Sequence, residues 1–110
     1  HLVLRRQRQM CIRDRGIGED IIPDNVDFSL IDHFEKVNDE DAAIYSRRLA
    51  KEEGIFAGYS CGAAIKGVLQ LKKHFSKNDV VVVLLHDSGS RYIEKIYNDE
   101  WMKEKGFKID

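Results

Sequence analysis

The spacing of apolar residues predicts a well-bounded helix in the middle of the chain. The segment "NDEDAAIYSRRLAKEEG" carries a narrow stripe of small or apolar residues at helical spacing, at Ala42, Ser46, Leu49 and Ala50. Asn38 is a suitable N-cap, and the acidic residues that follow it face the positive end of the helix dipole. Gly54 is a suitable C-terminal stop. We therefore expect a helix between Asn38 and Gly54.

A second helix and a buried strand are expected further along. Apolar residues fit helical spacing from Gly62 to Phe75, at Ala64, Ile65, Val68, Leu69 and Leu71. The segment "DVVVVLLH", residues 79–86, is continuous, β-branched and apolar on both faces. This composition is typical of an interior strand in a parallel sheet that helices cover on both sides.

The remaining segments carry weaker signals. A loop that contains the chain's single proline, Pro23, leads into a short strand or extended segment around Phe28 to Ile31. Residues 90–106 predict one helix or two short ones, because Asn98 can begin a new helix and Gly106 can end it. The order of these elements predicts an α/β fold. One strong strand leaves at least one bare sheet edge, so we expect the chain to be part of a larger domain.

Composition narrows the function classes. The chain has 110 residues, of which 43% are hydrophobic and 34% charged, as in a globular domain. It contains no apolar run long enough to span a bilayer, and its net charge of −1 gives no reason to expect nucleic acid or an anionic membrane as partner. Two cysteines are too few for a disulfide framework, which favours a cytoplasmic location. No histidine or cysteine pair has metal-ligand spacing, so no metal site is expected.

The first 15 residues differ from the rest. The segment "HLVLRRQRQMCIRDR" holds five Arg and one Asp, a net charge of +4, whereas residues 16–110 hold 13 basic and 18 acidic residues, a net charge of −5. A basic arm or a targeting peptide would explain such a segment. The string "MCIRDR" also resembles translated sequencing-adapter read-through. We expect residues 1–15 to be a non-native leader and exclude them from the fold prediction.

Ser60 is the principal candidate for chemistry. It lies in the frame Gly58-Tyr59-Ser60-Cys61-Gly62, which matches the G-x-S-x-G nucleophile elbow of α/β-hydrolases. A triad needs an acid and then a histidine downstream, and Asp79 followed by His86 is the one pair in that order. These two would lie at opposite ends of a strand, about 20 Å or more apart at ~3.3 Å per residue. A catalytic triad is therefore not expected. Ser60 could instead cap the next helix, or meet a ligand there.

Four segments together resemble the family of pyridoxal-phosphate enzymes that includes cysteine synthase and cystathionine β-synthase. They are "GIGEDIIP", "NDEDAAIYSRRLAKEEG", "GYSCGAAIKG" and "VVVVLLHDSGSRYIEKIYNDEWM", in the family's order over about 95 residues. The resemblance implies that residues 16–110 are the C-terminal portion of a fold type II catalytic domain, a parallel sheet flanked by helices. The ending "DEWMKEKGF" is closer to cystathionine β-synthases.

The resemblance implies roles for particular residues. The family's matching serine hydrogen-bonds the pyridine nitrogen of pyridoxal 5'-phosphate, which assigns Ser60 to the cofactor. Gly16 and Gly18 match glycines beside the active site. His86 and Asp87 begin the loop after the last strand, where open α/β sheets place ligands, so Asp87 and Ser88 are expected near the cofactor or substrate. Many family members have proline in place of His86, so we expect His86 to be a solvated loop histidine.

The implied activity is the condensation of L-serine with L-homocysteine to cystathionine, with cysteine synthase as the alternative. The family's Schiff-base lysine and its phosphate-binding glycine loop have no match in this chain, so we expect the chain alone to be inactive. By resemblance, the full-length enzyme is a homodimer that acts on small amino acids. An alternative of another class is a small interaction module with a basic N-terminal arm.

Overall fold

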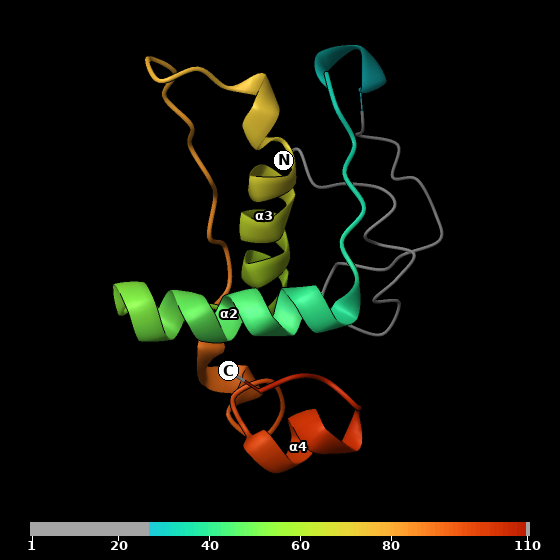
Figure 1. The fold of residues 1–110 in the computed structure, drawn as a ribbon, viewed down its shortest axis with the longest axis vertical. Helices are drawn as coiled ribbons and strands as arrows, with labels where there is room; N and C mark the ends of the chain where they lie inside the picture. The colour runs from blue at the N-terminus through green and yellow to red at the C-terminus, as the bar shows by residue number, and fades with distance from the viewer. Residues whose placement is uncertain (1–26, 110) are drawn as a thin grey trace.

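The chain is helical throughout most of the part that the structure describes. The computed structural model describes residues 27–109, so residues 1–15, Gly16 and Gly18 lie outside it. The helices are η1 (Phe28–Leu30), α2 (Asp39–Glu53), α3 (Tyr59–Gln70), η2 (Lys72–His74), η3 (Gly89–Tyr92) and α4 (Asp99–Glu104), where η marks a 3-10 helix. Figure 1 shows α2 lying across the start of α3, with α4 on the opposite side of α2.

Helix α2 forms where the sequence predicts it. The side chain of Asn38 accepts a hydrogen bond of 2.7 Å from the backbone N–H of Asp41, as an N-cap does. Gly54 ends the helix in the left-handed conformation, with φ of 70°. The stripe that includes Ala42 and Ser46 is buried against α3. Both the bounds and the inward face of this helix are therefore confirmed.

Helix α3 begins one turn earlier than predicted. Its N-cap is Gly58, which has no side chain to offer, and its first helical residue is Tyr59. Ser60 is thus the second residue of the helix, and the prediction that it caps the helix is wrong. The helix ends at Gln70, and a separate 3-10 turn continues the path to His74.

The predicted strands are not formed within residues 27–109. Residues 79–86 run without regular structure beside α3 (Figure 1), and the side chains of Val80 and Val82 are 90% and 87% exposed. A strand needs a neighbouring strand to pair its backbone N–H and C=O groups, and no described segment supplies one along 79–86. The segment Phe28–Leu30 is a 3-10 helix, because the carboxylate of Asp27 accepts from the N–H of Ser29 and closes a turn.

The described core lies where α2, α3, η3 and α4 meet. Its buried residues are Val37, Ala42, Ala43, Tyr59, Ala63, Tyr92, Ile96 and Met102. Gly62 allows α2 and α3 to approach closely, because a Cβ at that position would overlap the carbonyl oxygen of Ala42 and the hydroxyl of Ser46. Asn98 begins α4 by accepting from two N–H groups of its first turn, so residues 90–106 form two short helices.

A salt bridge joins α2 to the start of α4. The guanidinium of Arg47 contacts the carboxylate of Asp99 and donates a 3.0 Å hydrogen bond to the carbonyl of Ile96. Among the helices within residues 27–109, none has the length and apolar character needed to cross a membrane.

Candidate functional site

Ser60 lies in the first turn of α3 with its side chain directed at the loop that follows residues 79–85. The Oγ of Ser60 is 2.8 Å from the Nε2 of His86, although the two residues are 26 positions apart in the chain. Ser60 is 8% exposed, whereas His86 is an exposed residue. His86 is exposed in a loop, as expected, and it also contacts the candidate serine.

Two backbone hydrogen bonds hold the loop of residues 86–89 against residues 56–58, which precede α3. The N–H of Gly58 donates to the carbonyl of Asp87 at 2.9 Å, and the N–H of Gly89 donates to the carbonyl of Phe56 at 3.1 Å. They flank an isolated antiparallel bridge between Ala57 and Ser88. We call this pairing the turn–loop bridge. It places His86 beside the start of α3, so the position of the histidine follows from the backbone.

Asp87 supports the loop with its side chain. Its carboxylate accepts from the N–H of Ser88 at 2.9 Å and from the hydroxyl of Tyr92 at 3.0 Å. The guanidinium of Arg91 lies 3.7 Å away. The Asp87 side chain is 13% exposed and meets Gly58, where an added Cβ would lie 2.6 Å from Oδ2. Asp87 therefore organises the loop that lies beside the start of α3.

Two hydroxyl groups contact the backbone carbonyls of residues 57 and 58, just before α3. The Oγ of Ser46 donates to the carbonyl of Ala42 at 2.9 Å and lies 3.2 Å from the carbonyl of Gly58. The hydroxyl of Tyr97 donates to the carbonyl of Ala57. Burial, and secondarily the neighbouring Cys61 thiol, raise the pKa of Tyr97 to about 12. Tyr97 therefore stays protonated and keeps its donor role at neutral pH.

The Ser60–His86 pair has the separation of a nucleophile and its base, and a backbone carbonyl lies on the other side of the imidazole. The Nδ1 of His86 lies 3.4 Å from the carbonyl oxygen of Leu84, and the carboxylate of Asp79 accepts from the N–H of Ser76. A backbone carbonyl orients the imidazole without stabilising its charged form as a carboxylate would. Within residues 27–109 no group of three or more His, Cys, Asp or Glu could hold a metal ion.

Cys61 is buried beneath the same loop. Its thiol is free and lies 3.6 Å from the carbonyl oxygen of Asp87. Cys61 is the third residue of α3, so its side chain is buried within the first turn of the helix.

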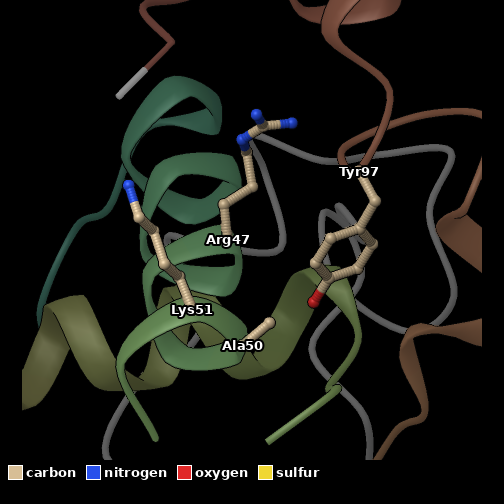
Figure 2. Close-up of a pocket in the computed structure, with 4 residues that line it drawn as sticks. All are labelled: Arg47, Ala50, Lys51 and Tyr97. Atoms are coloured by element: carbon tan, nitrogen blue, oxygen red, sulfur yellow. The ribbon is translucent and has the colours of Figure 1, made fainter. Parts of the chain in front are cut away.

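A separate shallow hollow lies between α2 and Tyr97, which precedes α4. It has a volume of about 320 Å³ and is lined by Arg47, Ala50, Lys51 and Tyr97 (Figure 2). Figure 2 shows the side chains of Arg47 and Lys51 rising from α2, with the ring of Tyr97 facing them. Neither Ser60 nor His86 lines this hollow, so it is not part of the candidate site.

The sequence predicted the residue at the centre of the site but missed its partner. Ser60, Asp87 and Ser88 were expected to lie near the cofactor or substrate, which stays a prediction; in the structure they belong to two segments that the turn–loop bridge joins. The contact with His86 was missed because it depends on the turn–loop bridge, which joins distant parts of the chain.

Comparison with known proteins identifies the family and several relatives. The sequence profile described as "Pyridoxal-phosphate dependent enzyme" matches residues 12–87. Cystathionine beta-synthase of Dictyostelium discoideum is 42% identical over 92 residues, which are 84% of this chain and 18% of that protein. Cysteine synthase of Buchnera aphidicola is 38% identical over 95 residues, which are 84% of this chain and 30% of that protein.

A solved structure has the same fold. The O-ureido-L-serine-bound K43A mutant of O-ureido-L-serine synthase superposes with a TM-score of 0.71 at 27% identity, covering 94% of this chain and 37% of that one. The chain thus spans less than a third of the length of the two curated relatives and just over a third of the solved structure.

Proposed function

Because this chain belongs to the family of pyridoxal-phosphate dependent enzymes, we propose that it forms the C-terminal part of a catalytic domain that carries out β-replacement on small amino acids. The family depends on pyridoxal phosphate, and its curated relatives include cystathionine beta-synthase and cysteine synthase. The observation that carries the proposal is the placement of Ser60, whose hydroxyl lies at the start of α3 and faces the loop of residues 86–88.

The residues present fit one part of the cofactor. A hydroxyl offers one donor and two acceptor positions, and His86 occupies one of these, so Ser60 can also hydrogen-bond a pyridine nitrogen. The turn–loop bridge and the largely covered carboxylate of Asp87 hold the loop beside it. When bound, pyridoxal phosphate supplies an electron sink for the α-carbon of the amino acid. Ser60 would hold the ring nitrogen, and a neutral hydroxyl there makes a weaker sink than a carboxylate would.

Lys66 does not complete the site as a Schiff-base lysine. Its ammonium lies 3.9 Å from the carboxylate of Asp41 and 5.2 Å from the centre of the Tyr45 ring. Lys66 therefore stabilises the contact between α3 and α2. The lysine and the phosphate-binding loop would come from another part of the full protein, in agreement with the share of the relatives that this chain covers.

Within this class, we propose condensation of L-serine with L-homocysteine to cystathionine, in a cytoplasmic homodimer. The relatives named cystathionine beta-synthase and the ending "DEWMKEKGF" support this assignment. Cysteine synthase is the alternative, supported by the relatives of that name. The two are separated by assaying the protein as its gene encodes it with serine and homocysteine, and in parallel with O-acetylserine and sulfide.

Two further measurements test the proposal. Ser60→Ala should weaken pyridoxal-phosphate binding about fivefold, since one hydrogen bond of about 1 kcal/mol is lost. Unchanged cofactor affinity in this variant would show that Ser60 does not bind the cofactor. Sequencing the source DNA across the codon for Gly16 should reveal a continuous frame upstream, with a Schiff-base lysine and a glycine-rich loop. Turnover by the 110-residue chain alone would contradict the view that it is a part of the catalytic domain.

A second candidate activity is ester hydrolysis, which the 2.8 Å separation of Ser60 and His86 favours. The carbonyl of Leu84 behind His86, where hydrolases place a carboxylate, speaks against high activity. Incubation with p-nitrophenyl acetate tests it: release of p-nitrophenol that Ser60→Ala abolishes would establish the nucleophile.

A further inference from the structure

Tyr92 is buried where the two segments of the candidate site meet. Its side chain is 1% exposed, and its hydroxyl donates a hydrogen bond of 3.0 Å to the Oδ2 of Asp87 in the loop. Its ring makes an edge-to-face contact with the ring of Tyr59, with 6.3 Å between the two centroids. Tyr59 is the first residue of α3 and directly precedes Ser60. One side chain therefore contacts both the loop and the first turn of the helix that carries Ser60.

The backbone of Tyr92 is held at both ends of its short helix. Tyr92 is the last residue of η3, and the first residue, Gly89, donates its N–H to the carbonyl of Phe56. The carbonyl of Tyr92 accepts from the N–H of Lys95 at 3.0 Å and from the N–H of Tyr97 at 3.2 Å. These hydrogen bonds connect η3 to segments on either side of it. The direction of the Tyr92 side chain is therefore set by the fold and does not depend on a ligand.

The hydroxyl of Tyr92 acts on the loop through Asp87. The two carboxylate oxygens of Asp87 have different partners, because Oδ1 accepts from the N–H of Ser88 and Oδ2 accepts from Tyr92. The same carboxylate lies against Gly58, the N-cap of α3, where an added Cβ would lie 2.6 Å from Oδ2. Without the Tyr92 hydroxyl, Oδ2 would lose this donor and the carboxylate could turn about its side-chain bonds. The contact that sets the spacing between the loop and the start of α3 would then loosen.

We propose that Tyr92 is a positioning residue for the cofactor site, where it holds the loop of residues 86–89 at a fixed distance from Ser60. This inference rests on the proposed function for the identity of the ligand. Tyr92 acts through two neighbours: its ring packs on Tyr59 at the start of α3, and its hydroxyl directs Asp87 in the loop. Tyr92→Phe removes the contact with the loop and keeps the ring against α3, so it separates the two parts of this role.

Cofactor binding to the protein as its gene encodes it tests this role. Tyr92→Phe should weaken pyridoxal-phosphate binding about threefold, which is less than the loss expected of Ser60→Ala, because the serine itself stays. At saturating cofactor, the visible circular dichroism of the bound cofactor should also change, since this signal depends on the orientation of the cofactor in its site. Asp87→Ala breaks the same hydrogen bond, so the double variant should bind the cofactor no more weakly than Asp87→Ala does.

Asn98→Ala is the matched control, because it destabilises the protein without changing the loop. Asn98 caps α4 by accepting from the N–H groups of Glu100 and Trp101. Cofactor affinity and circular dichroism of this variant should equal those of the wild type. An equal weakening in Asn98→Ala and Tyr92→Phe would show that Tyr92 acts only through overall stability, and would overturn the inference. Unchanged affinity and spectrum in Tyr92→Phe would also overturn it, as would losses that multiply in the double variant with Asp87→Ala.

A measurement without cofactor separates this inference from the proposed function. In ¹H–¹⁵N spectra of the cofactor-free protein, the backbone amide resonances of Ser60 and Ser88 should shift in Tyr92→Phe and stay unchanged in Asn98→Ala. Failure of pyridoxal phosphate to bind the wild type would overturn the proposed function, while these resonances still decide the role of Tyr92. Resonances that do not shift would overturn the inference and leave the proposed function standing. If Tyr92→Phe does not fold, Asp87→Ala takes its place, and an unshifted Ser60 amide in that variant would overturn the inference.

Discussion

The contact between Gly58 and Asp87 permits a quantitative test of how the loop is held to α3. A Cβ at Gly58 would lie 2.6 Å from the Oδ2 of Asp87 and 2.9 Å from its Cβ and Cγ. Ordinary carbon contacts are about 3.5–4.0 Å. Gly58 has φ of −79°, which alanine adopts without backbone strain, so the steric effect of Gly58→Ala comes from this contact, beside the smaller loss of a glycine N-cap.

We expect Gly58→Ala to lower the free energy of unfolding by about 2 kcal/mol, within the range of about 1–3 kcal/mol typical of overpacking. The Asp87 side chain cannot turn aside freely, because it accepts from the N–H of Ser88 and the hydroxyl of Tyr92. Asp87→Ala removes these hydrogen bonds at about 1 kcal/mol each, and it removes Oδ2 and Cγ while leaving its own Cβ 2.9 Å from the new Cβ. The double variant should therefore relieve part of the overlap, giving a coupling energy of about 1 kcal/mol.

Urea unfolding of the four proteins, followed by far-UV circular dichroism, measures the cycle. Gly54→Ala is the matched control, since Gly54 has φ of 70° and nothing within 4 Å of an added Cβ. It should cost about 1–2 kcal/mol through the backbone and add to Asp87→Ala without coupling. Additivity of Gly58→Ala and Asp87→Ala within about 0.5 kcal/mol would refute the described packing.

Three further predictions concern the support of the site. Gly62→Ala should cost about 3 kcal/mol in urea unfolding, and Ser46→Ala should not rescue it, because the backbone carbonyl of Ala42 also blocks the new Cβ; rescue would show that the helices can separate. Asn98→Ala should lower the free energy of unfolding by about 1 kcal/mol, and Asn98→Ser should lower it less, because serine can still cap α4. Equal losses in the two variants would show that the Asn98 side chain does not stabilise α4 as a cap. Tyr97 should not ionise until the pH approaches about 12, as read by ultraviolet absorbance. Since its folded pKa exceeds the ordinary 10.0, its contribution to stability is complete below pH 10 and lost as the pH rises toward 12. Tyr97→Phe should remove this part of the alkaline loss, and an unchanged profile would contradict it.

Local signals explain what the sequence predicts well. Helix α2 has a side-chain cap at Asn38 and a left-handed glycine at Gly54, so its bounds depend on residues adjacent to them in the chain. No capping side chain marks the start of helix α3, because its N-cap is Gly58. The hydroxyl of Ser60, the second residue of the helix, contacts His86 instead of capping the helix. A serine near a helix start is normally interpreted as a cap, and tertiary contact overrides that interpretation here.

Non-local structure explains what the sequence does not predict. The apolar run of residues 79–86 indicates burial between layers, but a strand forms only beside another strand, and within residues 27–109 Val80 and Val82 remain exposed. The site shows the same limit. Ser60 is recognisable from its glycine frame, whereas its contact with His86 requires the turn–loop bridge, which no local pattern encodes.

Hydrogen exchange at two amides of the turn–loop bridge would report on opening of the loop. The N–H groups of Gly58 and Gly89 lie outside regular strands, where exchange with solvent deuterium is usually rapid, yet each is hydrogen-bonded across the bridge. Their exchange rates would rise together whenever the loop lifts from the start of α3. Comparing them with the amides inside α2 would tell whether the loop opens by itself or only when the helices come apart. Occupation of the site at Ser60 should slow both glycines more than any residue of α2.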